Sequence, residues 1–269
     1  MKYPYDKDNL PELRNHYTTK KLMEFALKNK EQVYGIKGMS PCYNLKYFHL
    51  RKGFPQDYLH SCLEGASKQV TNLLLDVIDS SQFNLLQLLI SKVKSPHQIA
   101  RLCRLITDRN FWNGHEWENW TLYYSVPLFE LVLPEKHLYY WKLYVYTLHI
   151  LLKTDLTHAE IDKADSMLHE FVEGIQEIFG KEAISYNLHI FTHLAETCSS
   201  WGALWTHSTF PPECGNKHLL NATHCSKGVV HQIVRHSQII SATSIIEELS
   251  IHTFLPVYSS TANTYIQRK

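Results

Sequence analysis

Apolar residues recur at steps of three and four from Tyr58 to about Asp79, and this period limits the folds open to the chain more than any other feature. The stripe consists of Leu59, Leu63, Ala66, Val70, Leu73, Leu74 and Val77. Such spacing places the side chains on one face of an α-helix, and an apolar face of that length must pack against other elements. The sequence therefore predicts a long amphipathic helix that opens a helical body.

Similar periods and helix-boundary signals continue along the chain. Thr157 and Glu160 form a capping box, and the helix that they begin is predicted to stop at Gly180. The other predicted helices cover 83–92, 96–106, 114–132 with a kink at Pro127, 134–153, 185–199, a segment opened by Pro211 and Pro212, and 229–250. The predicted fold class is mainly α, and the tail 253–269 is expected to fray.

Residues 1–57 differ from this body and read as a basic arm. Residues 1–53 hold 11 lysine and arginine residues against 5 acidic ones, whereas the remainder holds 16 against 21. Thr18 or Thr19 is expected to cap a short helix through Lys30, and 43–54 is a candidate core strand because aromatic residues favour strands. A basic arm attracts phosphate, so DNA is a candidate partner of residues 1–53. A solvated lysine-rich face is the other interpretation.

Compartment and membrane signals are few. The first residues are polar, so no secretory signal is predicted, and no apolar run is long enough to span a bilayer. The six cysteines form no C-x-x-C pair, and without an export signal reduced thiols are expected. The sequence thus predicts an intracellular protein without a membrane segment.

Asp57 and His60 are the first candidate site residues. They lie three apart where the arm meets the predicted helix, so both side chains can face the same way. One interpretation is a polar pair that supports a metal or phosphate site. The other, which the spacing alone favours, is that Asp57 caps the helix and His60 is a partly buried polar residue.

Three further patterns have chemical potential. His189 and His193 are four residues apart and can share a helical face, but two histidines are too few for a zinc site. Glu213 falls in the first turn of the helix opened by Pro211, where a carboxylate is favourable by itself and can also ligate a catalytic metal. A loose cluster for structural zinc comprises Cys214, His218, His224, Cys225, His231 and His236.

Several stretches, taken in order, resemble the C-terminal half of eukaryotic cut-and-paste DNA transposases of the CACTA type. Their order, more than any one motif, carries the resemblance, which covers roughly 30–230. The stretches are 35–41 (GIKGMSP), 53–60 (GFPQDYLH), 111–112 (FW), 120–125 (WTLYYS), 133–136 (LPEK), 186–194 (YNLHIFTHL), 201–205 (WGALW) and 210–216 (FPPECGN).

This family resemblance implies a ribonuclease-H-like catalytic core in which two aspartates and a later glutamate hold two Mg²⁺ or Mn²⁺ ions. Glu213 is similar to the terminal glutamate, a remnant acid and the one candidate metal ligand. Asp57 and His60 look like the Asp-x-x-His element that precedes a helical insertion. The implied domains are the arm 1–57, the insertion 58–209, C-terminal helices 210–252 from the remnant of the α/β core, and the tail 253–269. A nuclear location is implied as well.

The departures from the family decide the functional prediction. Both catalytic aspartates of the family precede the equivalent of Gly35, and only Asp6 and Asp8 do so here, in a polar lead-in. One carboxylate of three is too few ligands for two metals. We therefore expect a transposase-derived protein that binds no metal and cuts no DNA by itself. The alternatives are a DNA- or protein-binding module and a zinc-structured protein. For the binding module, the aromatic residues around Trp112, Trp117 and Trp120 are either exposed for binding or buried in the core.

Overall fold

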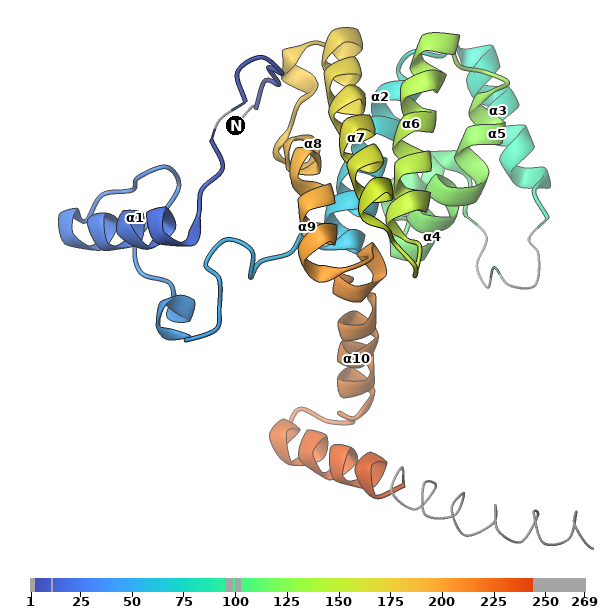
Figure 1. Ribbon diagram of the computed structural model, residues 1–269. Helices are drawn as coiled ribbons and strands as arrows, with labels where there is room; N and C mark the ends of the chain where they lie inside the picture. Colours follow the sequence, from blue (N-terminus) through green and yellow to red (C-terminus); the bar gives the residue numbers. More distant parts are fainter. Residues whose placement is uncertain (1–2, 11, 95–98, 100–102, 244–269) are drawn as a thin grey trace, which may run out of the picture. The chain divides into compact units, whose positions relative to one another are not determined.

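The computed structural model describes residues 3–10, 12–94, 99 and 103–243, and these divide after Thr209 into two compact units. Among the described residues the structure is mainly helical, and its only strand-like feature is an isolated bridge between Val33 and Ile36 (Figure 1). The prediction of a mainly α fold is confirmed. The sheet of a ribonuclease-H-like core is not seen in the described part.

The first unit holds most of the helices. The arm carries α1 (His16–Asn29) and a 3₁₀ turn (Pro41–Asn44). The body then runs through a π-helix (Tyr58–Ser67), α2 (Lys68–Leu75), α3 (Ser80–Lys92), 3₁₀ helix Ile106–Phe111, α4 (Gly114–Asn119), π-helix Trp120–Tyr124, α5 (Ser125–Phe129), α6 (Glu135–Leu151), α7 (His158–Phe179), 3₁₀ helix Lys181–Ala183, α8 (Tyr186–His189), 3₁₀ helix Ile190–His193, α9 (Leu194–Trp201) and 3₁₀ helix Leu204–His207. The second unit contains α10 (Phe210–Asn221) and a helix over 229–243.

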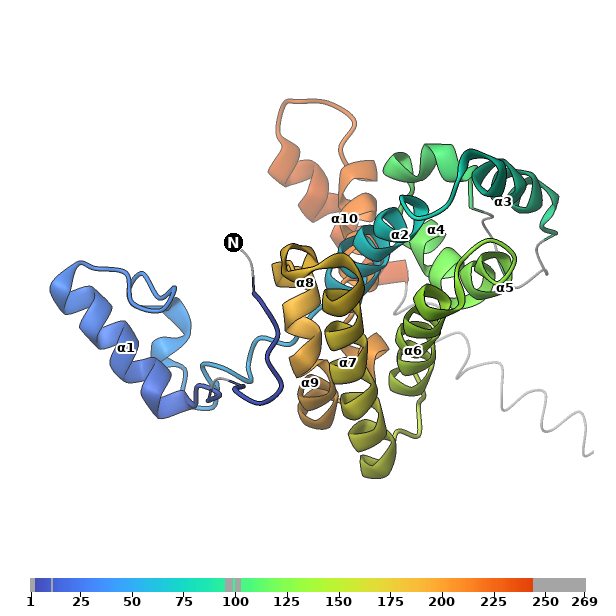
Figure 2. The ribbon, with the colours of Figure 1, turned by 90° about the horizontal axis from the view of Figure 1, so that it is seen from above.

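The centre of the first unit is the pair α6 and α7, which lie side by side in both views (Figures 1 and 2). Tyr144 of α6 stacks on Phe171 of α7 at 5.0 Å between ring centroids and on Phe191 at 5.4 Å. Its hydroxyl donates to the carbonyl of Cys62 at 2.8 Å, which satisfies the polar end of a fully buried ring. One side chain thereby ties α6, α7, the 3₁₀ helix 190–193 and the π-helix 58–67 into one core.

A second aromatic layer joins α2, α4, α5 and α6. Trp112, Trp117 and Trp120 are all buried, so of the two interpretations of these aromatics the core one is confirmed. The Trp120 indole donates to Thr71 Oγ1 at 3.0 Å, and the Trp141 indole donates to Ser125 Oγ at 2.8 Å. These two indole N–H groups are therefore satisfied inside the layer, whereas the buried Trp112 Nε1 has no hydrogen-bond partner among the described residues.

Several boundaries follow the sequence signals. Thr157 and Glu160 make the predicted capping box, and α7 ends at Gly180, whose φ of 82° suits glycine. The helix of the arm is capped by Asn15 and not by Thr18 or Thr19; Thr18 is instead the third helical residue and bonds back to Asn15. The prediction of the cap was wrong because asparagine, one residue before His16, is an equally strong cap and starts the helix earlier.

Two other predictions need correction. The candidate strand in 43–54 is absent: local turn bonds such as Phe48 N to Leu45 O and Gly53 N to His49 O hold this segment, and no neighbouring strand pairs with it among the described residues. In the predicted helix 96–106, residues 95–98 and 100–102 lie outside the described part. Residues 103–105 are not helical, since Arg104 bonds the buried carboxylate of Glu116 through its backbone and its guanidinium.

The predicted helices 58–79 and 114–132 both contain a π-helical stretch. In the second, a π-helix over Trp120–Tyr124 stands between α4 and α5, and Ser125 N bonds the carbonyl of Trp120, five residues back. Pro127 lacks the N–H that would continue the ladder, so the predicted break in regularity occurs just before it. The tail 253–269 and the end of the predicted helix 229–250 lie outside the described residues.

Candidate functional site

Asp57 sits at the start of the π-helix 58–67 and caps it. Its Oδ2 accepts from the backbone N–H of His60 at 2.6 Å and lies 2.6 Å from the His60 Nδ1. Asp57 itself is in an extended conformation, as a capping residue is. The structure therefore confirms that Asp57 is a cap, whereas His60, which was expected to be partly buried, has a side chain that is 54% exposed.

The same carboxylate also holds a residue 152 positions away. The backbone N–H of Thr209 donates to Asp57 Oδ1 at 2.7 Å, and the Thr209 hydroxyl donates to Oδ2 at 2.9 Å. We call these two hydrogen bonds the Asp57–Thr209 clasp. It joins the first and last residues of the helical body, and spacing alone did not foretell it because Thr209 is remote in the sequence.

The electrostatics of Asp57 follow from its donors. Burial by itself raises the pKa of the carboxyl, but the hydrogen bonds from His60 and Thr209 together outweigh burial and hold the pKa below its usual value. The side chain is 19% exposed. Both carboxylate oxygens accept hydrogen bonds from donors within the chain, so this geometry is that of a charged carboxylate with a structural role.

Glu213 lies in the first turn of α10, in the second unit, with an exposed side chain. The predicted placement at a helix start is confirmed. Asp57 belongs to the first unit, so the predicted site residues do not converge within one compact unit.

The late cysteines and histidines are also in the second unit. Cys214 and Cys225 are exposed, and the latter sits in a turn where its backbone N–H and carbonyl both bond the Gln232 amide. Over the residues that the structure describes, no three His, Cys, Asp or Glu side chains gather closely enough to hold a metal ion. The same stretch contains no helix that is long and apolar enough to cross a membrane.

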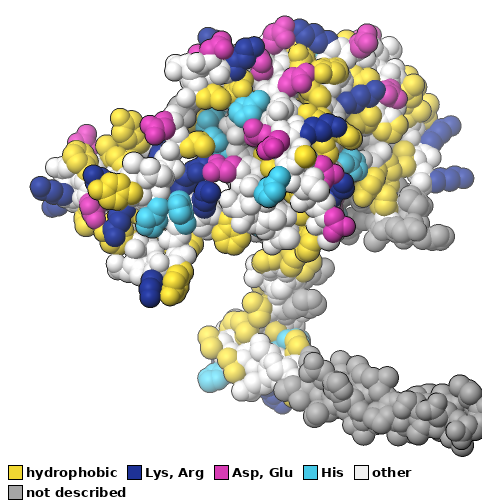
Figure 3. All heavy atoms as spheres, viewed as in Figure 1, with side chains coloured by type: hydrophobic (Ala, Val, Ile, Leu, Met, Phe, Trp, Pro, Cys, Tyr) yellow, Lys and Arg dark blue, Asp and Glu magenta, His cyan; other side chains and the backbone are white. Residues whose placement is uncertain are grey.

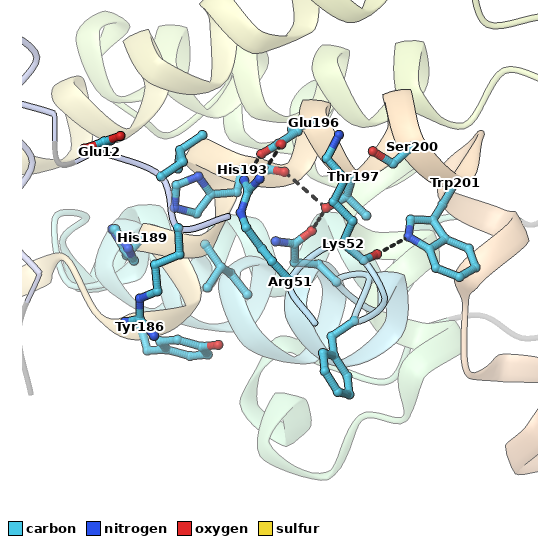
Figure 4. A pocket seen from close by; sticks show the side chains of 15 residues that line it. Glu12, Arg51, Lys52, Tyr186, His189, His193, Glu196, Thr197, Ser200 and Trp201 are labelled. Atoms are coloured by element: carbon cyan, nitrogen blue, oxygen red, sulfur yellow. Dashed lines mark hydrogen bonds and ion pairs between the residues drawn. The ribbon is translucent and has the colours of Figure 1, made fainter. Parts of the chain in front are cut away.

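The first unit also contains a cavity of about 440 Å³, which the sequence did not reveal (Figure 4). Residues 51–56 of the arm form one wall, and α8, α9 and the 3₁₀ helix between them form the other. His189 and His193 both line it, with ring centroids 5.3 Å apart and the planes perpendicular. They therefore share a face as predicted, and that face borders the cavity.

An ion pair between Arg51 and Glu196 crosses the cavity wall. Arg51 Nη1 lies 2.7 Å from Glu196 Oε1, and Nη2 bonds the second oxygen. These hydrogen bonds lower the pKa of Glu196 against the opposing effect of burial. Burial, the His189 ring and the Arg51 charge lower the pKa of His193, and burial lowers that of His189. Both histidines are therefore neutral at physiological pH.

The first residues of the arm form a strap along α7 and α8. The Tyr3 ring stacks on His189 at 4.8 Å, and the Tyr5 hydroxyl lies 2.8 Å from His169 Nδ1. The Gln176 amide accepts from Tyr5 N at 2.7 Å and donates to Tyr5 O at 2.8 Å. The strap borders a second cavity of about 450 Å³ that shares His189 and His193 with the first.

Comparison of the chain with protein-family models, with curated proteins and with solved structures gives no match.

Proposed function

We propose that this chain derives from a cut-and-paste DNA transposase of the CACTA type, with residues 58–209 as its helical insertion. The observation that carries the proposal is the Asp57–Thr209 clasp. A domain inserted into another must receive and return the chain at neighbouring points, and the clasp brings the first and last residues of the body together. The order of sequence motifs supplies the family, and a nuclear location accompanies it.

In this proposal the protein does not cleave DNA by itself. Two-metal phosphoryl transfer needs several carboxylates aimed at one point. Asp57 spends both oxygens on hydrogen bonds within the first unit. Asp6, the first acid of the lead-in, accepts from the backbone of Asp8 in a turn. These contacts support a structural use of the acids that precede α10.

A nicking assay tests the proposal. Supercoiled plasmid is incubated with the purified chain and Mg²⁺ or Mn²⁺, beside a Glu213→Ala variant. We expect no cleavage above the background of a mock purification. Cleavage that needs the metal and disappears in Glu213→Ala would refute the inactive form and show that Glu213 still serves in a catalytic site.

A second candidate is nucleic-acid binding through residues 1–53. Exposed aromatic residues and lysines alternate on this arm (Figure 3), and Lys21 lies over the Tyr17 ring at 4.4 Å. Cations beside exposed rings suit phosphate and base contacts. Among the described residues of the first unit, the three most exposed tyrosines, Tyr47, Tyr34 and Tyr17, all lie on this arm.

A salt-dependent mobility shift tests this candidate. We expect weak binding of duplex DNA at low salt, with affinity falling as salt rises because counterions are released. Lys21→Glu should weaken binding and lower the salt slope by about 1. Lys163→Glu is the matched control, since Lys163 lies over Tyr146 in the helical body in the same way. Absence of binding at low salt, or equal loss in both variants, contradicts the arm as the interface.

A further inference from the structure

The 440 Å³ cavity between residues 51–56 and α8–α9 is built from aromatic rings and cations that the helical core does not use. Its size falls in the range of small-ligand sites, about 300–1,000 Å³. Phe54, Tyr186 and Trp201 line it, and all three side chains are about half exposed. Three half-exposed rings around one hollow are available for stacking on a ligand.

The charged side chains of the cavity comprise one ion pair and an excess of cations over acids. Arg51 and Glu196 neutralise one another. Lys52 extends toward the α9 wall, where Ser200 also lines the cavity, and in the described part of the chain it makes no ion pair (Figure 4). Arg14 donates to the carbonyl of Tyr34 at 2.9 Å and forms no ion pair with any residue that the structure describes. Glu12, the remaining acid, lies at the opposite end of the cavity from Lys52 and Trp201 in Figure 4.

Lys52 and Trp201 are fixed beside each other. The Trp201 indole donates to the Lys52 carbonyl, so the ring of α9 and the backbone of residues 51–56 form one corner. A flat, aromatic ligand group can stack on such a ring while a negative group reaches the ammonium of the same lysine. His189 and His193, which are neutral, add hydrogen-bonding atoms without further charge.

We propose that this cavity binds a nucleoside monophosphate unit, with the base stacked on Trp201 and the phosphate on Lys52. The unit is either a free nucleotide or the terminal nucleotide of a nucleic-acid strand, which share this chemistry. A bare anion would leave the rings unused, and a neutral aromatic would leave the cations unused. The inference does not depend on the transposase origin, because it is argued only from the lining of the cavity and from the hydrogen bond between Trp201 and Lys52.

Titration of the full chain with dAMP, by ligand-observed NMR or calorimetry, tests the proposal. We expect saturable binding with a Kd of about 10 μM to 1 mM, and much weaker binding of deoxyadenosine and of inorganic phosphate. Lys52→Ala should weaken dAMP binding about tenfold, because a charged hydrogen bond is lost. Trp201→Leu should weaken it about fivefold or more by loss of stacking.

The controls separate the site from the fold. Lys46→Ala and Trp205→Leu remove an exposed lysine and a half-exposed tryptophan outside the cavity, and should leave binding within about twofold. Trp201→Phe loses the same hydrogen bond to Lys52 O as Trp201→Leu but keeps a ring, so it should retain most of the affinity. Urea midpoints of all variants confirm that each is folded.

A 5′-phosphorylated oligothymidylate that displaces dAMP and binds at least tenfold tighter would identify a strand terminus as the ligand; equal affinities would identify the free nucleotide. No saturable binding of dAMP or oligonucleotide, binding of deoxyadenosine as tight as that of dAMP, or equal loss in the control variants would each overturn the proposal. Such a failure leaves the nicking result, and hence the proposed origin, untouched.

Discussion

Replacement of Asp57 by alanine removes both the cap of the π-helix and the Asp57–Thr209 clasp. We expect it to destabilise the first unit more than the loss of any other single polar side chain that is partly exposed. The side chain makes contacts with His60 N, His60 Nδ1, Thr209 N and Thr209 Oγ1, at 2.6 to 2.9 Å. With 19% of the side chain exposed, water can replace only part of this set. The variant should therefore lose local and long-range stabilisation together.

The magnitude follows from these contacts. Loss of an aspartate cap costs about 1 kcal/mol. Each of the two bonds to Thr209 adds about 1 kcal/mol, less than the roughly 1.5–3 kcal/mol typical of a bond to a charged group, because Thr209 is only half-buried. The free energy of unfolding of the first unit should fall by about 3 kcal/mol, which lowers the midpoint of thermal unfolding by roughly 6–12 °C for a unit of this size.

Urea unfolding followed by tryptophan fluorescence measures this loss, because the buried indoles Trp117, Trp120 and Trp141 all belong to the first unit. Asp79→Ala is the matched control. Asp79 caps α3 through Ser81 N and Gln82 N, but all hydrogen bonds of its side chain are within three residues. It should cost clearly less than Asp57→Ala.

A double-mutant cycle isolates the clasp from the cap. Thr209→Val deletes the hydroxyl bond to Asp57 and the 3.0 Å contact of the same hydroxyl with His60 Nδ1. It should cost about 1 kcal/mol, and clearly less when Asp57 is already alanine. If Asp57→Ala and Asp79→Ala are equally destabilising, or if the two changes at 57 and 209 are additive, then the clasp does not stabilise the body and the reasoning is wrong.

Two further results are expected. The pKa values of His189 and His193 are lowered from 6.5, so the unfolded chain binds more protons than the folded one below about pH 6.5, and stability should fall as pH drops from about 7.5 to 5. Urea midpoints at several pH values measure this. If His193→Gln leaves the slope of stability against pH unchanged, the explanation is contradicted. Gly174→Ala places a Cβ 2.1 Å from the Tyr140 ring at the α6–α7 contact and should cost about 1–3 kcal/mol in thermal unfolding. Tyr140→Leu should relieve that cost; undiminished destabilisation in the double variant argues against a steric origin.

Much of the helical layout could be predicted because its signals are local. The capping box at Thr157, the stop at Gly180 and the cap at Asp57 each act through hydrogen bonds within a few residues. The apolar stripe from Leu59 to Leu74 predicted a buried face, and those positions at its centre are buried. Where a competing local signal existed, as with Asn15 before Thr18, the boundary moved by a few residues.

The candidate site was less accessible to sequence reasoning. Asp57, His60 and Glu213 were singled out correctly as helix-start residues, but the cavity residues Lys52 and Trp201 carry no motif. Because they are 149 residues apart, the sequence could not predict the hydrogen bond from the Trp201 indole to the Lys52 carbonyl that places them together. The pair His189 and His193 was noticed for its spacing, while the cavity beside it was not.

By itself the sequence determined that the chain is mainly helical, where most helices begin and end, and that Asp57 begins the body, since propensity, period and capping depend on neighbours along the chain. Only the tertiary structure decided that Thr209 returns to Asp57, that Arg51 meets Glu196, and that three exposed rings surround one cavity. Those contacts join residues about 150 positions apart. They arise from the packing of α6, α7 and α9, which is set by side-chain volume in three dimensions and leaves no periodic trace in the sequence.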